Sequence, residues 1–402
     1  MSPTPLWRRP AFVLLAAALI AFSAFGIRQS MGLYMRPISD GLGWGREILS
    51  FALATQNLLI GLAAPFFGAL ADKWGPPKIL ALGGAIFASG IFTMSQATTP
   101  GMMFVGSGLM AGLGLGACGM PLILATVSQV APADKRSLWL GITTALATGG
   151  QLLVVPASQS VIASIDWVTA LLFLSVMAAM IVPISLSTSA AITPETGKDT
   201  TLNISEALSE AWKHNGFRLL TVGFFVCGFH VAFLAIHLPA YVHDRCSLPG
   251  LGATALMLIA FFNMIGAWSS GWLGGRYSKK YLLSSIYMAR AVVMTAFVIM
   301  PTTATTVIIF ACLIGLLWLS TVPATSGLVS QIFGLRYMGM LYGIVFLSHQ
   351  LGAFVGVWLG GRVFDTTGSY DAVWWVAIAL GIASAFIHLP INEKPVTRLA
   401  TS

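Results

Sequence analysis

The sequence predicts an all-α membrane protein in which twelve transmembrane helices form two similar six-helix bundles. Of its 402 residues, 57% are hydrophobic and only 8% are charged, whereas soluble proteins average about 25% charged residues. Apolar stretches of about 18 residues or more recur along the chain, long enough to cross a hydrocarbon core of roughly 30 Å. Helices are expected because lipid cannot satisfy exposed backbone groups, and the stretches are too long and too evenly apolar for barrel strands. We place the helices at residues 11–36, 47–71, 78–98, 102–131, 137–164, 167–189, 215–242, 250–274, 281–301, 304–333, 337–363 and 371–391.

The basic residues indicate how these helices are oriented. Of the 21 Lys and Arg residues, Arg28 and Arg290 lie well inside predicted helices. Of those in loops or near helix ends, four lie on one side of the membrane and fifteen on the other, which holds both termini. The positive-inside rule assigns the richer side to the cytoplasm, so we expect a multi-pass protein of the cytoplasmic (inner) membrane with both termini cytoplasmic. Arg8 and Arg9 before an apolar run resemble a signal peptide, but we interpret this start as an uncleaved first helix.

The longest polar segment divides the chain. We interpret residues 190–213 as a cytoplasmic linker between an N-terminal six-helix bundle at 1–189 and a C-terminal six-helix bundle at 214–402. Within it, Ile204–Lys213 is expected to form a short amphipathic helix on the membrane surface. The four cysteines give no disulfide framework, because three of them lie in predicted helices.

The two halves repeat each other at an offset of 202 residues. Several matches at one offset, in corresponding helices, indicate two halves related by an axis along the membrane normal. Such an arrangement places a binding site near the membrane midplane, between the halves, and favours alternating access by rocking. The offset joins Pro37 to Pro239, Pro121 to Pro323, Ser128–Gln129 to Ser330–Gln331, Gly141 to Gly343 and Gly150 to Gly352.

Arg28 is the most informative residue for function. It lies inside the first predicted helix, where a permanently charged guanidinium costs roughly 3 kcal/mol or more unless it faces protein, water or an anion. All thirteen Asp and Glu residues fall in loops or at helix ends, so a substrate anion is the expected partner of Arg28. The alternative is an arginine that extends to the outer interface. For Arg290, in the ninth predicted helix, we favour that packing or snorkelling role.

The loop between the second and third predicted helices resembles the signature loop of the major facilitator superfamily. It is formed by Gly68–Lys78, and with the twelve helices and the repeat the resemblance covers nearly the whole chain. The resemblance implies a cytoplasmic gate in which an acid and a base of this loop join neighbouring helices. At an offset of 203 residues, the second copy of this loop has Gly275 where the acid is expected, so a symmetric latch is not implied. The gating residues are Asp72, Lys73, Lys78 and Arg276.

The first helix is similar to that of the monocarboxylate and oxalate/formate branch of this superfamily. The run Phe22–Ile38 places Arg28 where that branch has a basic residue implicated in engaging the carboxylate substrate. In the eighth helix, Asn263 and Ala267 stand where the animal members have an acid and an arginine, so a proton–lactate mechanism does not carry over. His349 lies in the region of helix 11 where the oxalate exchanger has a lysine.

The repeat and the resemblance together predict a substrate site. The offset carries Arg28 onto His230, and helices 1 and 7 line the cavity in this superfamily; His237 lies two turns further along helix 7. We expect Arg28 to act as a fixed anion clamp and His230 or His349 as a hydrogen-bonding or titratable partner, with packing as the alternative for each histidine. The other candidates are polar side chains that are also compatible with helix contacts, namely Asn57, Gln151, Asn263 and Tyr34.

The sequence favours a secondary active transporter that moves a small organic anion, a carboxylate, by rocker-switch alternating access, as a proton symporter or an anion exchanger. No phosphate-cradling loop, nucleophile elbow or zinc-type spacing occurs, so neither ATP drive, nor an enzyme, nor a cofactor is expected. The expected partners are the anion, a coupling proton or counter-anion, and the lipid bilayer, without nucleic acid, for a protein expected to be monomeric.

Two alternatives stay open. An exporter of drugs or amphiphilic metabolites is less favoured, because cationic drugs usually call for an acid within the membrane. A transporter of a soft metal or its chelate is the other, because sulfur and imidazole ligands suit copper. Its candidate ligands are Cys227, His230, His237, Met31 and Met35.

Overall fold

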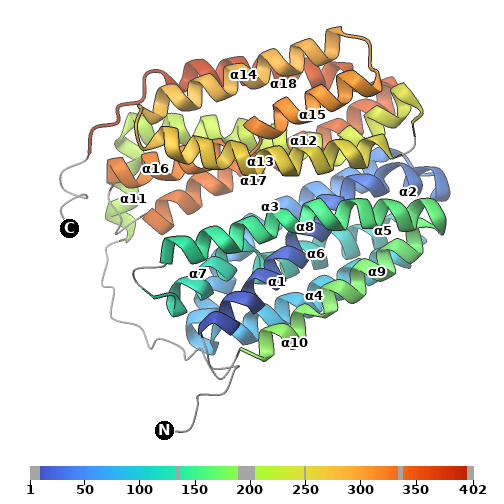
Figure 1. The fold of residues 1–402 in the computed structure, drawn as a ribbon, viewed down its shortest axis with the longest axis horizontal. Coiled ribbons are helices and arrows are strands. Elements are labelled where there is room, and N and C mark those ends of the chain that lie inside the picture. The colour runs from blue at the N-terminus through green and yellow to red at the C-terminus, as the bar shows by residue number, and fades with distance from the viewer. Residues whose placement is uncertain (1–9, 133–135, 189–203, 249, 334–337, 396–402) are drawn as a thin grey trace. The chain divides into compact units, whose positions relative to one another are not determined.

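The computed structural model describes residues 10–132, 136–188, 204–248, 250–333 and 338–395, and most of them are helical (Figure 1). Within these ranges, twelve helical segments are long and apolar enough to cross a membrane. The predicted all-α membrane architecture is therefore confirmed. The contacts divide the chain into two compact units, residues 1–200 and 201–402.

Unit 1 contains the first six spans. The first span continues six residues beyond its predicted end, because Pro37 falls in the first turn of a new helix, where its missing N–H group is tolerated. The helices are α1 (Pro10–Ser30), the 3-10 helix η2 (Met31–Tyr34) and α2 (Met35–Leu42); α3 (Arg46–Trp74); α4 (Pro76–Ser95); α5 (Pro100–Met103), the π-helix η3 (Phe104–Met110), α6 (Ala111–Cys118) and α7 (Met120–Val130); α8 (Arg136–Ser164); and α9 (Trp167–Ala179) with α10 (Ile181–Leu186).

Unit 2 begins with the short helix that the sequence predicts at Ile204–Lys213. This helix, α11, buries Ala211 in the same apolar core as Phe217 and Phe333, while Trp212 remains half exposed. The spans that follow are α12 (Asn215–Cys246), α13 (Leu251–Gly274), α14 (Lys279–Ile299), α15 (Ala304–Leu317) with α16 (Thr321–Phe333), α17 (Met338–Thr367) and α18 (Asp371–His388).

Several helices begin or end at residues whose conformation or side chain suits a helix end. Gly75 ends α3 with φ of 91°, a conformation that side chains rarely adopt, and Pro76 begins α4 where no N–H group is needed. Asp166 caps α9 by accepting a 2.6 Å hydrogen bond from the Thr169 N–H, which lowers the pKa of its carboxyl group. These caps satisfy backbone groups that the helix itself leaves unpaired.

A pair of glycines brings two helices into close contact in each unit. Gly26 on α1 faces Gly150 on α8, and a Cβ at Gly150 would collide with the carbonyl group of Phe22. In unit 2, Gly228 on α12 and Gly352 on α17 lie equally close to the backbone of the opposing helix. The offset of 202 residues relates both positions of one pair to those of the other. Glycines allow such backbone approach in membrane helices.

The fourth and tenth spans are broken at equivalent positions. In the fourth, the extended residue Gly119 separates α6 from α7, and Pro121 lies in the first turn of α7. In the tenth, α15 ends at Leu317 and α16 begins at Thr321, with Pro323 in its first turn. The 202-residue offset relates Gly119 to Thr321. Both breaks fit the preference of proline for the start of a helix.

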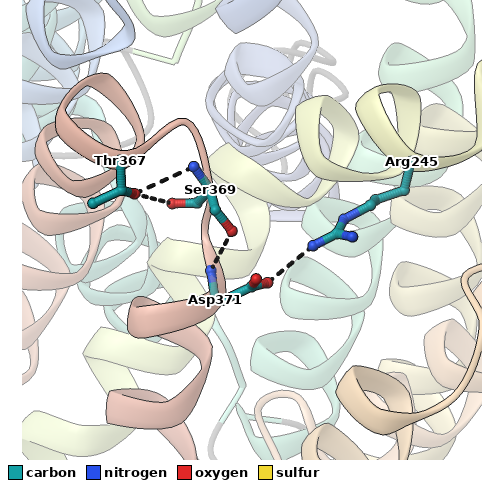
Figure 2. A network of polar contacts seen from close by, with 4 residues as sticks. All are labelled: Arg245, Thr367, Ser369 and Asp371. Atoms are coloured by element: carbon teal, nitrogen blue, oxygen red, sulfur yellow. Dashed lines mark hydrogen bonds and ion pairs between the residues drawn. The ribbon is translucent and has the colours of Figure 1, made fainter.

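The turn between α17 and α18 is held by a polar network (Figure 2). Thr367 Oγ1 donates to the carbonyl oxygen of Ser369, whose hydroxyl oxygen accepts from the Asp371 N–H at 3.0 Å. The carboxylate of Asp371 in turn forms a 3.0 Å ion pair with Arg245 near the end of α12. Both charged groups are about half exposed, so the pair organises a surface turn and lies outside the core.

Candidate substrate-binding site

Arg28 and Asn57 are the two predicted site residues that the structure brings into contact. Arg28, near the end of α1, is partly exposed, whereas Asn57 on α3 is buried. Arg28 Nη2 donates a 2.5 Å hydrogen bond to Asn57 Oδ1, and Asn57 Nδ2 donates a 2.8 Å bond to the Leu53 carbonyl oxygen. The second bond keeps the amide oxygen directed at the guanidinium.

The charged guanidinium of Arg28 is hydrogen-bonded to a neutral amide. In the described part of the chain, no carboxylate lies within ion-pair distance of Arg28. A guanidinium carries five N–H donors in a planar fork that matches a carboxylate, and beyond the bond to Asn57 no hydrogen bond from Arg28 is formed to the described residues. The group therefore retains donors for an anion while its position is fixed by Asn57.

Gln151 and Tyr34 contribute to a separate polar contact within unit 1. Gln29 Nε2 on α1 donates a 3.2 Å bond to Gln151 Oε1 on α8, and both side chains are buried. Tyr34 is fully buried, and its hydroxyl and that of Ser158 on α8 form no hydrogen bond with the described residues. These groups lie among the residues that pack α1 and η2 against α8.

His237 and His230, both on α12, bind different neighbours. His237 is fully buried, with Nδ1 at 3.2 Å from the Tyr370 hydroxyl and Nε2 at 2.8 Å from the Val357 carbonyl oxygen. His230 Nε2 lies 2.7 Å from the Ala377 carbonyl oxygen on α18. Both contacts favour the packing alternative for these two histidines.

His349 and Asn263 also contact different neighbours. His349 on α17 is stacked on Phe346 and its Nδ1 lies 3.1 Å from Gln350 Oε1. Asn263 on α13 accepts a 3.0 Å hydrogen bond from the Leu319 N–H, inside the break of the tenth span. Asn263 thus stabilises unwound backbone. In the ranges that the structure describes, no group of three or more His, Cys, Asp or Glu residues is arranged to hold a metal ion.

The predicted gating residues lie at the helix ends of the signature loop and its second copy. Lys73 and Lys78 are exposed on either side of the Gly75 turn, and Arg276 lies 3.8 Å from the ring centroid of Trp272. The side chain of Asp72 falls outside the described residues. Their gating role stays a prediction.

Glu393 is a residue that the sequence reasoning missed. It follows α18, and its carboxylate accepts a 2.7 Å hydrogen bond from the Lys280 N–H in the first turn of α14. Gln331 connects the same region, because it accepts a 2.7 Å bond from Lys279 Nζ and donates a 3.2 Å bond to the Glu393 carbonyl oxygen. An acid at a helix N-terminus is stabilising, and Glu393 supplies one where Gly275 leaves the loop without it. No local motif marks Glu393, which lies 118 residues further along the chain.

The fold, the repeat and the signature loop agree with a direct sequence comparison. A sequence model of the Major Facilitator Superfamily matches residues 13–357. The chain belongs to this superfamily. It is a membrane transporter and not an enzyme, as the sequence predicts.

Several superfamily members align with nearly the whole chain. The uncharacterized MFS-type transporter YcxA of Bacillus subtilis is 24% identical and covers 98% of this chain and 97% of its own. Monocarboxylate transporter 13 of Rattus norvegicus is 24% identical over 94% of this chain and 88% of its own. This similarity is consistent with the resemblance of the first helix to the monocarboxylate branch.

Solved structures share the fold. A bacterial homologue of the human lysosomal transporter Spinster matches with a TM-score of 0.77 and 13% identity, covering 99% of this chain and 98% of its own. The nucleoside transporter NupG matches with a TM-score of 0.74 and 15% identity over 94% and 99%. At these identities the likeness concerns the fold alone.

Proposed function

We propose that this superfamily member transports a small organic anion with a carboxylate group, and that Arg28 binds that carboxylate. The observation that carries the proposal is a membrane-span guanidinium held by a neutral amide, with no carboxylate among the described residues in reach. A charge at such a position is costly unless an anion or water compensates it. A carboxylate would form the bidentate, charge-assisted pair that an arginine favours.

The relatives support the same substrate class. Monocarboxylate transporters 13 of Rattus norvegicus and 11 of Mus musculus align with 94% of the chain at 24% and 23% identity. Their names state a class of substrate for those proteins, and Arg28 gives a physical reason to extend that class to this chain. We place the protein in the cytoplasmic membrane with both termini cytoplasmic, in keeping with the asymmetry of its basic residues.

Coupling is proposed to follow one of two routes. In proton symport, the proton travels on the substrate acid or on a histidine. His349 is our candidate because both nitrogens of His237 are held by protein partners and because His349 is more exposed than His230, at 7% against 1%. In anion exchange, Arg28 binds the two anions alternately and no proton carrier is needed. Uptake by His349→Gln across pH separates the routes: an unchanged pH dependence removes His349 from the proposal.

The test of the carboxylate proposal uses proteoliposomes containing the purified full-length protein. Uptake of radiolabelled lactate, benzoate and oxalate is measured for the wild type, Arg28→Gln and Asn57→Asp. The second variant leaves Arg28 in place but puts a carboxylate beside its guanidinium, within hydrogen-bond distance. We expect both variants to lose uptake of the transported anion. Thermal stability is measured alongside, because Asn57→Asp gains an ion pair with Arg28 but loses the bond that the Asn57 amide donates to the Leu53 carbonyl oxygen.

Arg36→Gln is the matched control. Arg36 belongs to the same span, but it is partly exposed and paired with Asp40 at 3.3 Å, four residues away. We expect this variant to retain uptake. The proposal fails if Asn57→Asp transports the same carboxylate at the wild-type rate, or if none of the three anions is taken up while an uncharged or cationic solute is.

A further inference from the structure

The break of the tenth span is held from several sides by polar side chains. The Asn263 amide oxygen accepts from the Leu319 N–H at 3.0 Å, and the Ser270 hydroxyl donates to the Ser320 carbonyl oxygen. Arg290, on α14, donates to carbonyl groups at the end of α15. Backbone that leaves a helix within a membrane span needs such partners, because lipid offers none.

Arg290 makes the most extensive of these contacts. Its Nε and Nη2 donate to the Leu317 carbonyl oxygen at 3.1 and 2.6 Å, and Nη2 also donates to that of Trp318. Only 1% of the residue is exposed, and its guanidinium lies 5.4 Å from the ring centroid of Tyr287. Among the described residues no carboxylate forms an ion pair with it. Its charge is therefore compensated by backbone carbonyl groups and an aromatic ring.

The carbonyl groups that Arg290 meets are the negative end of a helix. The last carbonyl groups of α15 have no partner within the helix, and the helix dipole adds roughly half a negative charge there. In membrane transporters, the ends of broken helices and their unwound carbonyl groups are places where a cation such as sodium is coordinated. Here a side chain of the protein occupies that position.

We propose that Arg290 is a built-in cation that positions the C-terminal end of α15, in the place where a bound metal cation would otherwise sit. Because a guanidinium does not lose its proton at physiological pH, this end of α15 is held without an exchangeable ion. Arg290 is accordingly a positioning residue for the broken span. The inference does not depend on the carboxylate proposal, since it involves neither Arg28 nor a substrate.

The equivalent break in unit 1 lacks this device. The offset of 202 residues relates Arg290 to Ala88 on α4, so the helix that corresponds to α14 has an alanine in place of the arginine. The fourth and tenth spans thus share a break but differ in charge at that break. Of these two breaks, the one in the tenth span has an arginine from the neighbouring helix at this position, and the one in the fourth has an alanine.

The test is chemical rescue of Arg290→Ala in the purified full-length protein. Removing the side chain leaves space beside the Leu317 and Trp318 carbonyl groups that a free guanidinium ion fits. Thermal stability is measured, together with hydrogen–deuterium exchange of the peptide that contains Leu319. We expect exchange at that amide to accelerate about tenfold or more, because hydrogen bonds to a charged group are lost. Guanidinium chloride, far below denaturing concentration, should restore both readouts.

The controls separate charge from shape. Urea at the same concentration has a similar planar shape and N–H donors but no charge, and sodium chloride matches the ionic strength; neither is expected to restore the wild-type exchange rate. Arg245→Ala, which removes an exposed arginine of unit 2, should show neither fast exchange at Leu319 nor rescue. Equal rescue by urea, or a wild-type exchange rate in Arg290→Ala, overturns the proposal.

A second variant covers the case in which Arg290→Ala does not fold. Arg290→Lys keeps the charge with fewer fixed donors, and we expect it to fold with an exchange rate at Leu319 between those of the wild type and the alanine variant. For Arg290→Ala itself, guanidinium present during solubilisation should then increase the yield of monodisperse protein. If Arg290→Met is as stable as the wild type and protects Leu319 equally, a cation is not needed at this position and the inference is wrong.

Discussion

Replacing Gly150 with alanine is expected to separate α1 from α8. A Cβ at this position would lie 2.8 Å from the carbonyl carbon and 3.0 Å from the Cα of Phe22, where ordinary contacts begin near 3.4 Å. The obstacle is backbone, which cannot rotate away as a side chain can. One helix therefore has to move away from the other by at least half an ångström.

The size of the effect follows from this geometry. Inserting a methyl group into well-packed structure typically costs about 1–3 kcal/mol. A methyl group on Gly149, the preceding residue of α8, would meet no neighbouring group within 4 Å. Alanine there should gain about 0.5–1 kcal/mol, the usual difference between alanine and glycine in a helix. The two neighbouring substitutions should therefore differ by about 1.5–4 kcal/mol with opposite signs.

The assay is equilibrium unfolding of the purified protein in detergent, with Gly150→Ala and Gly149→Ala measured in parallel. Unit 2 provides an independent repeat, because Gly352 lies against the backbone of Phe225 whereas Gly343 on the same helix has open space. If the two variants of either pair have the same stability, the close contact between the helices is refuted.

Three smaller predictions concern other contacts. Asp371→Asn should lower the free energy of unfolding by no more than about 1 kcal/mol, since its pair with Arg245 is exposed; a larger loss, measured at low and high salt, would contradict this. Burial holds the pKa of His214 below its ordinary value of 6.5, so its stabilising effect is complete above pH 6.5 and is lost as the pH falls through the folded-state value. Thermal stability should thus drop more steeply for the wild type than for His214→Gln between about pH 7.5 and about pH 5, and parallel curves would argue against it. Gln151→Leu should cost about 1–3 kcal/mol, because the buried Gln29 amide loses its acceptor; chemical denaturation checks this value.

The twelve spans were predictable because each depends on composition over many residues. A stretch such as 250–274 is apolar throughout, and the observed helix α13 differs from it by one residue at its start. The breaks within the fourth and tenth spans were harder to locate, although the repeat relates Pro121 to Pro323. Proline is compatible with the first turn of a helix and with a kink, so its presence alone does not show where the backbone leaves the helix.

The sequence allowed the candidate site residues to be chosen by their type, but it did not predict which residues they contact. The polarity and position of Arg28 and Asn57 identified both, but their contact requires two helices that no local pattern relates. His230 illustrates the limit of the repeat. The offset places it at the position of Arg28, yet its short imidazole reaches the Ala377 carbonyl group on α18, whereas the longer arginine reaches α3. Equivalent backbone positions therefore gave side chains with different neighbours.

The two membrane arginines show why contacts decide a role that sequence leaves open. Both are permanently charged residues in apolar helices, and both lack a carboxylate partner among the described residues. Arg290 is buried, and two of its nitrogens donate to the end of a helix whose dipole already favours a cation. Arg28 is partly exposed and donates to one amide oxygen, so most of its donors remain for a ligand. An anion at Arg290 would share the guanidinium with backbone carbonyl groups, and burial leaves only 1% of that residue exposed, whereas an anion that bound Arg28 would complete its coordination. The structure thus favours Arg28 over Arg290 as the residue that binds a transported anion.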